Sequence, residues 1–288
     1  MGAGIAQVFA SAGHAVTVFE PSPAVRATIR GRIAEALRLY ELDESVAQTV
    51  EVTDDLALAV RRADFVTETA PEKLELKQSI FADLVRLSPG AAILASNTSV
   101  IPIHRIAKGL PTAERIVGTH WWNPPALIPL VEVVQSTRTT EATVRATMEL
   151  LAAIGKSPAH VTKDLPGFVA NRLQHALWRE AIAMVRAGIC DAATLDACVK
   201  NSFGMRLAVL GPLENADLVG LDLTLDIHKT IIPELDRSDR PDPYLEAQVA
   251  AGRLGFKTGA GFRAWSEDEM SALRRRLAAH LLKARRTA

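Results

Sequence analysis

A histidine and a glutamate twelve residues apart are the residues whose types and spacing best suit proton transfer. His120 ends one apolar, β-branched run and Glu132 lies inside the next, with an Asn-Pro-Pro turn between the two runs. A bend between adjacent strands would bring the imidazole and the carboxylate together, and a carboxylate on one ring nitrogen raises the basicity of the other. Two interpretations stay open from these residues alone: a general base with its partner, or a hydrogen-bonded core histidine beside an edge charge.

Composition and length indicate the class of protein to which this pair belongs. The chain has 288 residues, 48% of them hydrophobic and 23% charged, which indicates an ordinary globular protein of two domains. Its 33 basic and 33 acidic residues cancel, so no nucleic-acid surface is predicted. No apolar run reaches the ~18 residues of a membrane span. The two cysteines, Cys190 and Cys198, have no neighbours at metal spacing, so we expect buried thiols, no metal and a cytoplasmic location.

The N-terminal residues resemble the end of a dinucleotide-binding fingerprint. Gly2 can be the third glycine of G-x-G-x-x-G, because Glu20 follows 18 residues later, near the distance expected for the acid that binds the adenosine ribose. The first strand and two glycines would then lie upstream of Met1. Alternatively, Gly-Ala-Gly is a frayed terminus and Glu20 an ordinary strand-end charge. As a ribose ligand, Glu20 would repel a 2'-phosphate and favour NAD over NADP.

Short apolar strands and amphipathic helices alternate up to about residue 163. We expect strands at 14–20, 50–53, 64–70, 91–95, 115–121, 128–134 and 159–162, and helices at 5–12, 23–42, 74–87 and 140–154. In an open parallel sheet, ligands bind beyond the carboxyl ends of strands, where Glu72, Asn97 and Ser99 would lie. Ser99 could equally cap the short helix that begins near Ile101.

Beyond Asp164-Leu165-Pro166-Gly167 the pattern becomes helical almost throughout. We expect helices at 168–186, 191–200, 213–232 and 267–286, and a surface loop at 233–243. The sequence therefore predicts an α/β, Rossmann-type, doubly wound domain at 1–163, lacking its first strand, and an all-α domain at 164–288.

With these pieces assembled, the sequence resembles the 3-hydroxyacyl-CoA dehydrogenase family over nearly its whole length. Six short motifs carry the resemblance, in the family's order and spacing: Met1-Gly2-Ala3-Gly4-Ile5-Ala6, Ser96-Asn97-Thr98-Ser99, His120-x-x-Asn123-Pro124, Leu130-Val131-Glu132, Pro166-Gly167-Phe168-Val169-Ala170-Asn171-Arg172, and Lys257-Thr258-Gly259-x-Gly261-Phe262. The resemblance implies an NAD-dependent oxidoreductase of fatty-acid metabolism that oxidises a 3-hydroxyacyl-CoA, such as 3-hydroxybutyryl-CoA, or a related 3-hydroxy acid. It also implies a homodimer formed through the C-terminal domain.

Carried over to this sequence, the family's roles make His120 the base and Glu132 its partner. Ser99 and Asn171 would bind the substrate oxygen, and Asn123 would shape the pocket. The NAD site would be lined by Gly2, Glu20, Glu72, Lys77 and Asn97.

Two features depart from the acyl-CoA pattern: Trp121-Trp122 stands where Phe-Phe is usual, and the second domain reads Gly-Met-Arg-Leu-Ala-Val-Leu-Gly-Pro at 204–212. Both resemble the branches that act on free hydroxy acids, near λ-crystallin and gulonate 3-dehydrogenase, carnitine dehydrogenase and a pyridine-ring dehydrogenase. Arg206 could bind a free carboxylate there, or cap a helix or bridge subunits. A third alternative is a structural relative that binds no NAD.

Overall fold

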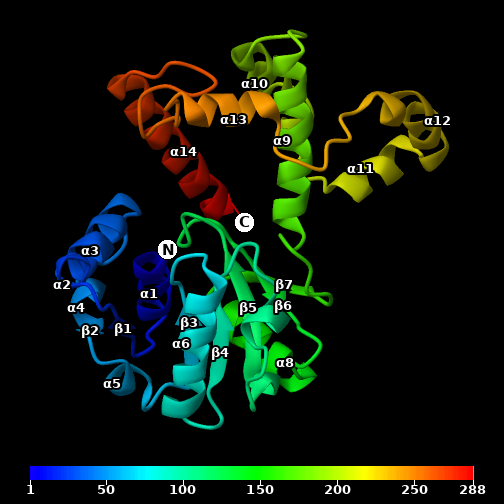
Figure 1. The fold of residues 1–288 in the computed structure, drawn as a ribbon. Coiled ribbons are helices and arrows are strands. Elements are labelled where there is room, and N and C mark those ends of the chain that lie inside the picture. The colour runs from blue at the N-terminus through cyan, green and yellow to red at the C-terminus, as the bar shows by residue number, and fades with distance from the viewer. Residues whose placement is uncertain (288) are drawn as a thin grey trace. The chain divides into compact units, whose positions relative to one another are not determined.

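The chain folds into two compact units, which Figure 1 shows with the colour running along the chain. A computed structural model describes residues 1–287. The first unit runs from Met1 to Arg172 and includes the end of the C-terminal helix from Ala279, while the second runs from Leu173 to Ala278. This division falls inside helix α9 (Ala170–Arg186), nine residues beyond our predicted boundary at 163/164.

The first unit contains a five-stranded sheet and a separate two-stranded sheet. The larger sheet has the order β3-β4-β5-β6-β7, and only its β5–β6 pair is antiparallel. Its strands are β3 (Phe65–Glu68), β4 (Ile93–Ser96), β5 (Ile116–Trp121), β6 (Leu130–Val134) and β7 (Ser157–Val161). The smaller sheet pairs β1 (Thr17–Phe19) with β2 (Glu51–Thr53) in parallel. The predicted α/β class with a largely parallel sheet is confirmed.

The two sheets are separated between β1 and β3, where a Rossmann fold has its first strand. In the Rossmann strand order 3-2-1-4-5-6, the first strand lies between the second and the fourth. β2, β1 and β3 take the places of the third, second and fourth strands, and β1 is not paired with β3 within residues 1–287. The place of the first strand is thus the one that the described residues do not fill, and the expectation of an upstream strand stays a prediction.

Helices cover both faces of the larger sheet, as the doubly wound prediction requires (Figure 1). Successive side chains of a strand point to opposite faces. In β4, Leu94 packs with Phe81 of α6 (Leu74–Leu87), and the next residue, Ala95, packs with Ile5 of α1 (Gly2–Ser11). α7 (Ile103–Ile106) shares the face of α6, and α8 (Glu141–Ala153) shares that of α1.

The helix predicted at 23–42 is wrong in one respect, because it is two helices. α2 (Pro23–Arg26) ends before Thr28, and α3 (Ile29–Leu39) begins after it. The hydroxyl of Thr28 donates to the carbonyl oxygen of Val25 at 2.7 Å, a local bond that competes with the backbone ladder. Two shorter helices, α4 (Val46–Thr49) and α5 (Leu56–Val60), complete the first unit with a 3₁₀ turn at Ala113–Arg115.

The second unit is helical, with two departures from the prediction. Its helices after α9 are α10 (Ala192–Lys200), α11 (Pro212–Val219), α12 (Leu221–Ile231), α13 (Pro243–Ala250) and α14 (Glu267–Thr287). The single helix predicted at 213–232 breaks at Gly220, whose φ of 104° is open to glycine but strained for other residues. α13 follows directly on the predicted loop, because Asp242 caps it and Pro243 suits the first helical position.

The helices of the second unit bury little of their apolar surface. None of the residues of α9 to α13 is buried, and large apolar side chains on them such as Leu213, Leu218 and Leu221 are 79%, 70% and 63% exposed. The cysteine prediction is wrong in part: both thiols are free, but Cys198 is exposed and Cys190 half-buried. Within residues 1–287, no helix combines the length and the apolar character needed to cross a membrane.

Candidate active site

His120 and Glu132 are direct partners across the antiparallel β5–β6 pair. Their side chains lie on the same face of the sheet, and Nδ1 of His120 is 2.7 Å from Oε2 of Glu132. Both are buried, with 5% and 1% of their surface exposed. Because a carboxylate faces Nδ1, that nitrogen carries the ring proton, and the lone pair of a neutral imidazole is then on Nε2. This is the arrangement that the twelve-residue spacing predicted.

The second oxygen of Glu132 anchors the start of α9. Oε1 accepts hydrogen bonds from the backbone N–H groups of Val169 and Ala170, at 2.9 and 3.1 Å. Burial pushes the pKa of Glu132 upward, but the hydrogen bonds from His120, Ala170 and Val169 outweigh burial and leave that pKa below its usual value. Glu132 is therefore held as a carboxylate, and a helix N-terminus is a favourable place for one.

Aromatic rings surround the imidazole of His120. The ring of Trp122 lies 5.4 Å from that of His120, and the ring of Phe168 lies 5.7 Å away. Phe168 takes a φ of 50° directly after Gly167, at 76°, which turns the chain just before α9. The buried indole Nε1 of Trp122 has no hydrogen-bond partner in the part of the chain that the structure describes. A buried indole N–H normally has an acceptor, so this donor is unusual beside the imidazole.

Two hydrogen bonds hold three of the predicted site residues, Asn97, Ser99 and Asn171, in place. Asn97 accepts a hydrogen bond from the backbone N–H of Trp121 at 2.9 Å, which ties the end of β4 to the residue after His120. The amide nitrogen of Asn171 donates to the carbonyl oxygen of Ser99 at 3.1 Å. One N–H of Asn171 and the Ser99 hydroxyl then remain to bind a substrate oxygen.

Glu72 fixes the loop that carries Ser99. Its Oε1 accepts a hydrogen bond from the hydroxyl of Thr98, and three more from the backbone N–H groups of Ser99, Val100 and Ile101 at 3.2, 3.2 and 3.3 Å. Burial alone would raise the pKa of Glu72, but these bonds and nearby Lys77 lower it below its usual value. Glu72 thus organises the loop as well as lying near the predicted cofactor site.

Lys77 belongs to a buried network that sequence reasoning missed. Its ammonium is fully buried and donates to both carboxylate oxygens of Glu68 at 2.8 and 3.0 Å, and to the carbonyl oxygen of Ala70 at 3.1 Å. Ser96 donates to Glu68 at 2.7 Å, which joins β3 to β4. Lys77 thus supports the loops after β3 and β4 from beneath, and its expected place in the NAD site stays a prediction.

The residues expected to hold the cofactor lie at the first turn of α1 and at the end of β1. A Cβ on Gly2 would be 2.8 Å from Oγ1 of Thr69, just beyond β3, so only glycine lets α1 start this close to the sheet. Glu20 follows the last residue of β1, and its Oε1 accepts a hydrogen bond from the N–H of Ser22 at 2.9 Å. NAD binding uses a helix N-terminus that lies close to the sheet, for the diphosphate, and an acid at the end of a strand, for the ribose.

Lys156 holds the loop between β5 and β6, which contains Asn123. Its ammonium donates to the carbonyl oxygens of Pro125 and Ile128, the latter at 3.1 Å, and lies 5.5 Å from the ring centre of Trp121. Burial, and next the positive charge of Arg285, lower the pKa of Lys156 to about 8. No sequence pattern that we used pointed to this residue.

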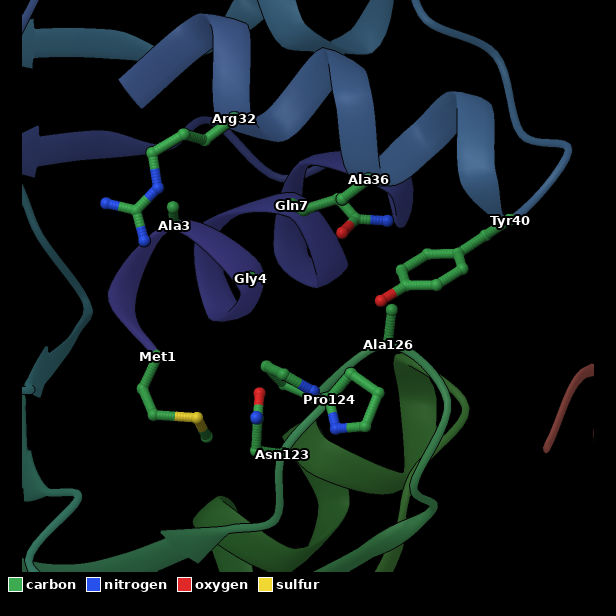
Figure 2. A pocket seen from close by; sticks show the side chains of 11 residues that line it. Met1, Ala3, Gly4, Gln7, Arg32, Ala36, Tyr40, Asn123, Pro124 and Ala126 are labelled. Atoms are coloured by element: carbon green, nitrogen blue, oxygen red, sulfur yellow. The ribbon is translucent and has the colours of Figure 1, made fainter. Parts of the chain in front are cut away.

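A cavity of about 170 Å³ lies between α1, α3 and the β5–β6 loop (Figure 2). The polar side chains around it are those of Gln7, Arg32, Tyr40 and Asn123, and its other walls are small or apolar. Arg206 belongs to the second unit, where it is exposed after the 3₁₀ turn Phe203–Met205, so its carboxylate contact stays a prediction. Within residues 1–287, no group of His, Cys, Asp or Glu is arranged to hold a metal ion.

Family models match both parts of the chain. The 3-hydroxyacyl-CoA dehydrogenase NAD binding domain matches residues 1–165, and the C-terminal domain of the same family matches residues 167–265. These two matches span most of the sequence.

Two curated relatives act on free acids by name. The chain is 34% identical to 5-formyl-3-hydroxy-2-methylpyridine 4-carboxylate 5-dehydrogenase of Mesorhizobium japonicum, over 99% of this chain and 94% of the relative. It is 39% identical to L-carnitine dehydrogenase of Streptomyces griseus, over 83% of this chain and 76% of the relative.

Solved structures of enzymes named for a free acid and for a CoA thioester are both similar to this chain. The crystal structure of a 5-formyl-3-hydroxy-2-methylpyridine 4-carboxylic acid 5-dehydrogenase, an NAD⁺-dependent dismutase, superposes with a TM-score of 0.92 at 33% identity, over 100% of this chain and 94% of that chain. For (S)-3-hydroxybutyryl-CoA dehydrogenase of Ralstonia eutropha, the TM-score is 0.73 at 32% identity, over 93% of this chain and 96% of that chain.

Proposed function

The chain belongs to the 3-hydroxyacyl-CoA dehydrogenase family, and from that premise we propose that this NAD-dependent oxidoreductase oxidises the hydroxyl group of a free carboxylic acid. The observation that carries the proposal is the indole of Trp122, whose ring lies 5.4 Å from that of His120 and whose N–H, like that of Trp121, has no acceptor among residues 1–287. A carboxylate is a strong acceptor, and phenylalanine at this position would offer no donor. The likeness to relatives named for free acids supports the same choice.

In the proposed reaction, His120 takes the hydroxyl proton of the substrate on Nε2. Glu132 accepts the other ring proton as a hydrogen bond and stabilises the imidazolium that forms, as a buried partner carboxylate does. Ser99 and Asn171 hold the substrate oxygen while its charge develops. NAD supplies the hydride acceptor when it is bound.

The residues proposed to hold the cofactor suit an adenosine-ribose and a diphosphate. Glu20 would bind the ribose at the end of β1, and the close start of α1 at Gly2 would face the diphosphate. Asn97 and Glu72 would line the site through the loop that they already organise. Lys77 would complete the cofactor site from beneath that loop, where its ammonium already binds Glu68.

We further propose that two copies associate through the second unit. Its helices α9 to α13 bury no residue, while Leu213, Leu218 and Leu221 are 79%, 70% and 63% exposed. Apolar area of this extent favours a permanent partner, and a two-fold dimer is the commonest arrangement among soluble oligomers. A dimer of this chain would cover these side chains without a second kind of protein.

The proposed substrate class can be tested by NADH consumption with acetoacetate and acetoacetyl-CoA in parallel. A form extended upstream by a β-strand and a Gly-x-Gly turn should be assayed beside the chain itself, because the first-strand place in the Rossmann order is not filled by residues 1–287. Faster turnover of acetoacetate supports the free-acid proposal. Faster turnover of the thioester instead assigns the enzyme to 3-hydroxyacyl-CoA substrates, the second candidate, which the family's name favours.

A further inference from the structure

The loop between β5 and β6 carries two side chains of the candidate active site. It covers residues 122–129, and in it Trp122 lies 5.4 Å from the ring of His120, while Asn123 follows directly. Three of its eight residues are prolines, which have no backbone N–H to donate. A loop this poor in donors cannot be held by strand-like hydrogen bonds, so its position depends on contacts from outside.

The ammonium of Lys156 supplies such contacts at both ends of the single turn in this loop. It donates to the carbonyl oxygens of Pro125 and Ile128, the latter at 3.1 Å. Within the turn, the N–H groups of Leu127 and Ile128 both donate to the carbonyl oxygen of Pro124 at 3.0 Å. Lys156 directly precedes β7, so one side chain joins the loop to the larger sheet.

This ammonium is buried without a counter-ion. Lys156 is 9% exposed, and no carboxylate of residues 1–287 pairs with it. Its other neighbours are the ring of Trp121, 5.5 Å away, and the positive charge of Arg285, which adds to burial in lowering the pKa of Lys156. A buried charge without a counter-ion opposes folding, and an apolar side chain would be easier to bury. A charge that is kept against stability is typical of a residue with a functional role.

The same loop also lies against the helix of the proposed cofactor site. A Cβ on Gly4 of α1 would be 2.7 Å from Cγ of Pro125, so the helix and the loop are in close contact. Figure 2 shows Asn123, Pro124 and Ala126 along the loop, next to α1. Pro125 thus touches α1 with its ring and Lys156 with its carbonyl group.

We propose that Lys156 is a positioning residue: by binding two carbonyl oxygens of the β5–β6 loop, it keeps Trp122 and Asn123 in place beside His120. It acts through the loop and needs no contact with the substrate. The inference rests on the proposed proton transfer to His120, but it applies to a free acid and to a thioester alike. A shift of about 1 Å in groups that orient a substrate can cost about 10²-fold in rate, so a loosened loop should be visible in turnover.

The first test compares Lys156→Met with Lys108→Met, which changes an exposed lysine after α7, on the full chain. In Lys156→Met, the amides of Leu127 and Ile128 should exchange with deuterium about tenfold faster or more, followed by NMR, because the loop loses hydrogen bonds from a charged donor. Exchange in β3 and β4 should stay as in the parent. Lys108→Met should match the parent throughout.

Kinetics of the same variants distinguish positioning from a general loss of folded protein. For whichever of 3-hydroxybutyrate and 3-hydroxybutyryl-CoA the enzyme oxidises, kcat/KM should fall about 10²-fold in Lys156→Met, with a raised KM for that substrate. The affinity for NAD should stay within about twofold of the parent, because α1 keeps its own packing. A lower kcat with a parental KM would mean that only the amount of folded enzyme has changed, and would overturn the proposal.

A double-mutant cycle tests whether Lys156 acts through the loop. Trp122→Ala removes the ring beside His120, and the double variant Lys156→Met/Trp122→Ala should lose no more kcat/KM than the more damaging single variant. Losses that add in full would show that Lys156 acts independently of Trp122, which contradicts the proposal.

Lys156→Gln serves as the second variant if Lys156→Met does not fold, because its amide keeps N–H donors without the charge. We expect exchange at Leu127 and Ile128 between that of the parent and that of an open loop, with kcat/KM about tenfold lower. Parental exchange in the variants that fold overturns the proposal. Deuterium exchange needs no turnover, so an inactive parent would refute the proposed function without altering this result.

Discussion

Glu132 bonds His120 through one carboxylate oxygen and the first N–H groups of α9 through the other. The imidazole is therefore oriented by a residue that is itself held on two sides, by the β5–β6 register and by a helix terminus. An orienting partner of this kind fixes the tautomer of the base and stabilises its protonated form.

Replacing Glu132 by glutamine should lower kcat by about 10²-fold or more, because an amide neither stabilises the imidazolium nor fixes the tautomer in the same way. The affinity for NAD should stay close to that of the parent. Glu149→Gln on the exposed side of α8 is the control. Steady-state kinetics decide the matter, and near-parental kcat in Glu132→Gln would remove the pair from the mechanism.

Trp122→Phe keeps an aromatic ring beside His120 and removes only the indole N–H. We expect KM for a free acid to rise about tenfold, since one hydrogen bond to a charged acceptor is lost, while kcat/KM for the thioester changes little. The two substrates should be compared in the same preparation. An equal change for both would show that the ring, and not its donor, matters.

Lys77→Met should be strongly destabilising, by about 3 kcal/mol or more, because it leaves the Glu68 carboxylate buried without its cation. Adding Glu68→Gln should recover part of this loss, since an uncharged amide is easier to bury. Chemical denaturation of the two variants measures both effects. If instead Lys77→Met unfolds like the parent and loses NAD affinity, Lys77 acts at the cofactor site and does not stabilise the fold.

The lowered pKa of Glu72 gives a pH dependence in the acid range. A carboxyl group whose folded pKa lies below its unfolded value stabilises the protein above that unfolded value, here 4.5, and this stabilisation is lost as the pH falls through the folded pKa. The difference in melting temperature between the parent and Glu72→Gln should therefore be largest near pH 7 and shrink below about 4.5. A difference that grows in acid would contradict this assignment.

The lowered pKa of Lys156 gives a second pH dependence, in the alkaline range. Its pKa falls from 10.5 to about 8 on folding, so between these values the unfolded chain binds more protons and stability rises with pH. The full effect is at most about 3 kcal/mol. Relative to Lys156→Met, the parent should thus gain melting temperature between pH 8 and 10, measured in buffers of equal ionic strength. A constant difference would mean that the ammonium is not desolvated.

The sequence predicted the elements whose signals are local. Helix α6 begins and ends at the predicted residues, Leu74 and Leu87, and the pairing of His120 with Glu132 follows from two apolar runs around a proline turn. The break at Gly220 and the start of α13 at Pro243 were misjudged, because a helical periodicity continues across the glycine and a proline marks a helix start as well as a loop.

The buried polar networks could not be predicted in the same way. Glu68, Lys77 and Ser96 come from a strand, a helix and a second strand, and each looks ordinary in its own segment. Only the packing of three elements brings their charges together. The same holds for Lys156, whose partners are backbone carbonyl groups. Every residue has such a group, so the sequence does not show which ones will bind the lysine.

The two N–H groups that reach Glu132 also set where this protein can be cut. A fragment ending at residue 163 would contain every strand of the larger sheet but would lack Val169, Ala170 and Asn171, and with them the donors to Glu132 and to the carbonyl oxygen of Ser99. A nucleotide-binding fragment intended for ligand screening, or for fusion to another partner, should therefore extend at least through Arg172. The last strand of the sheet ends at Val161, but the residues that keep His120 oriented through Glu132 continue to Ala170.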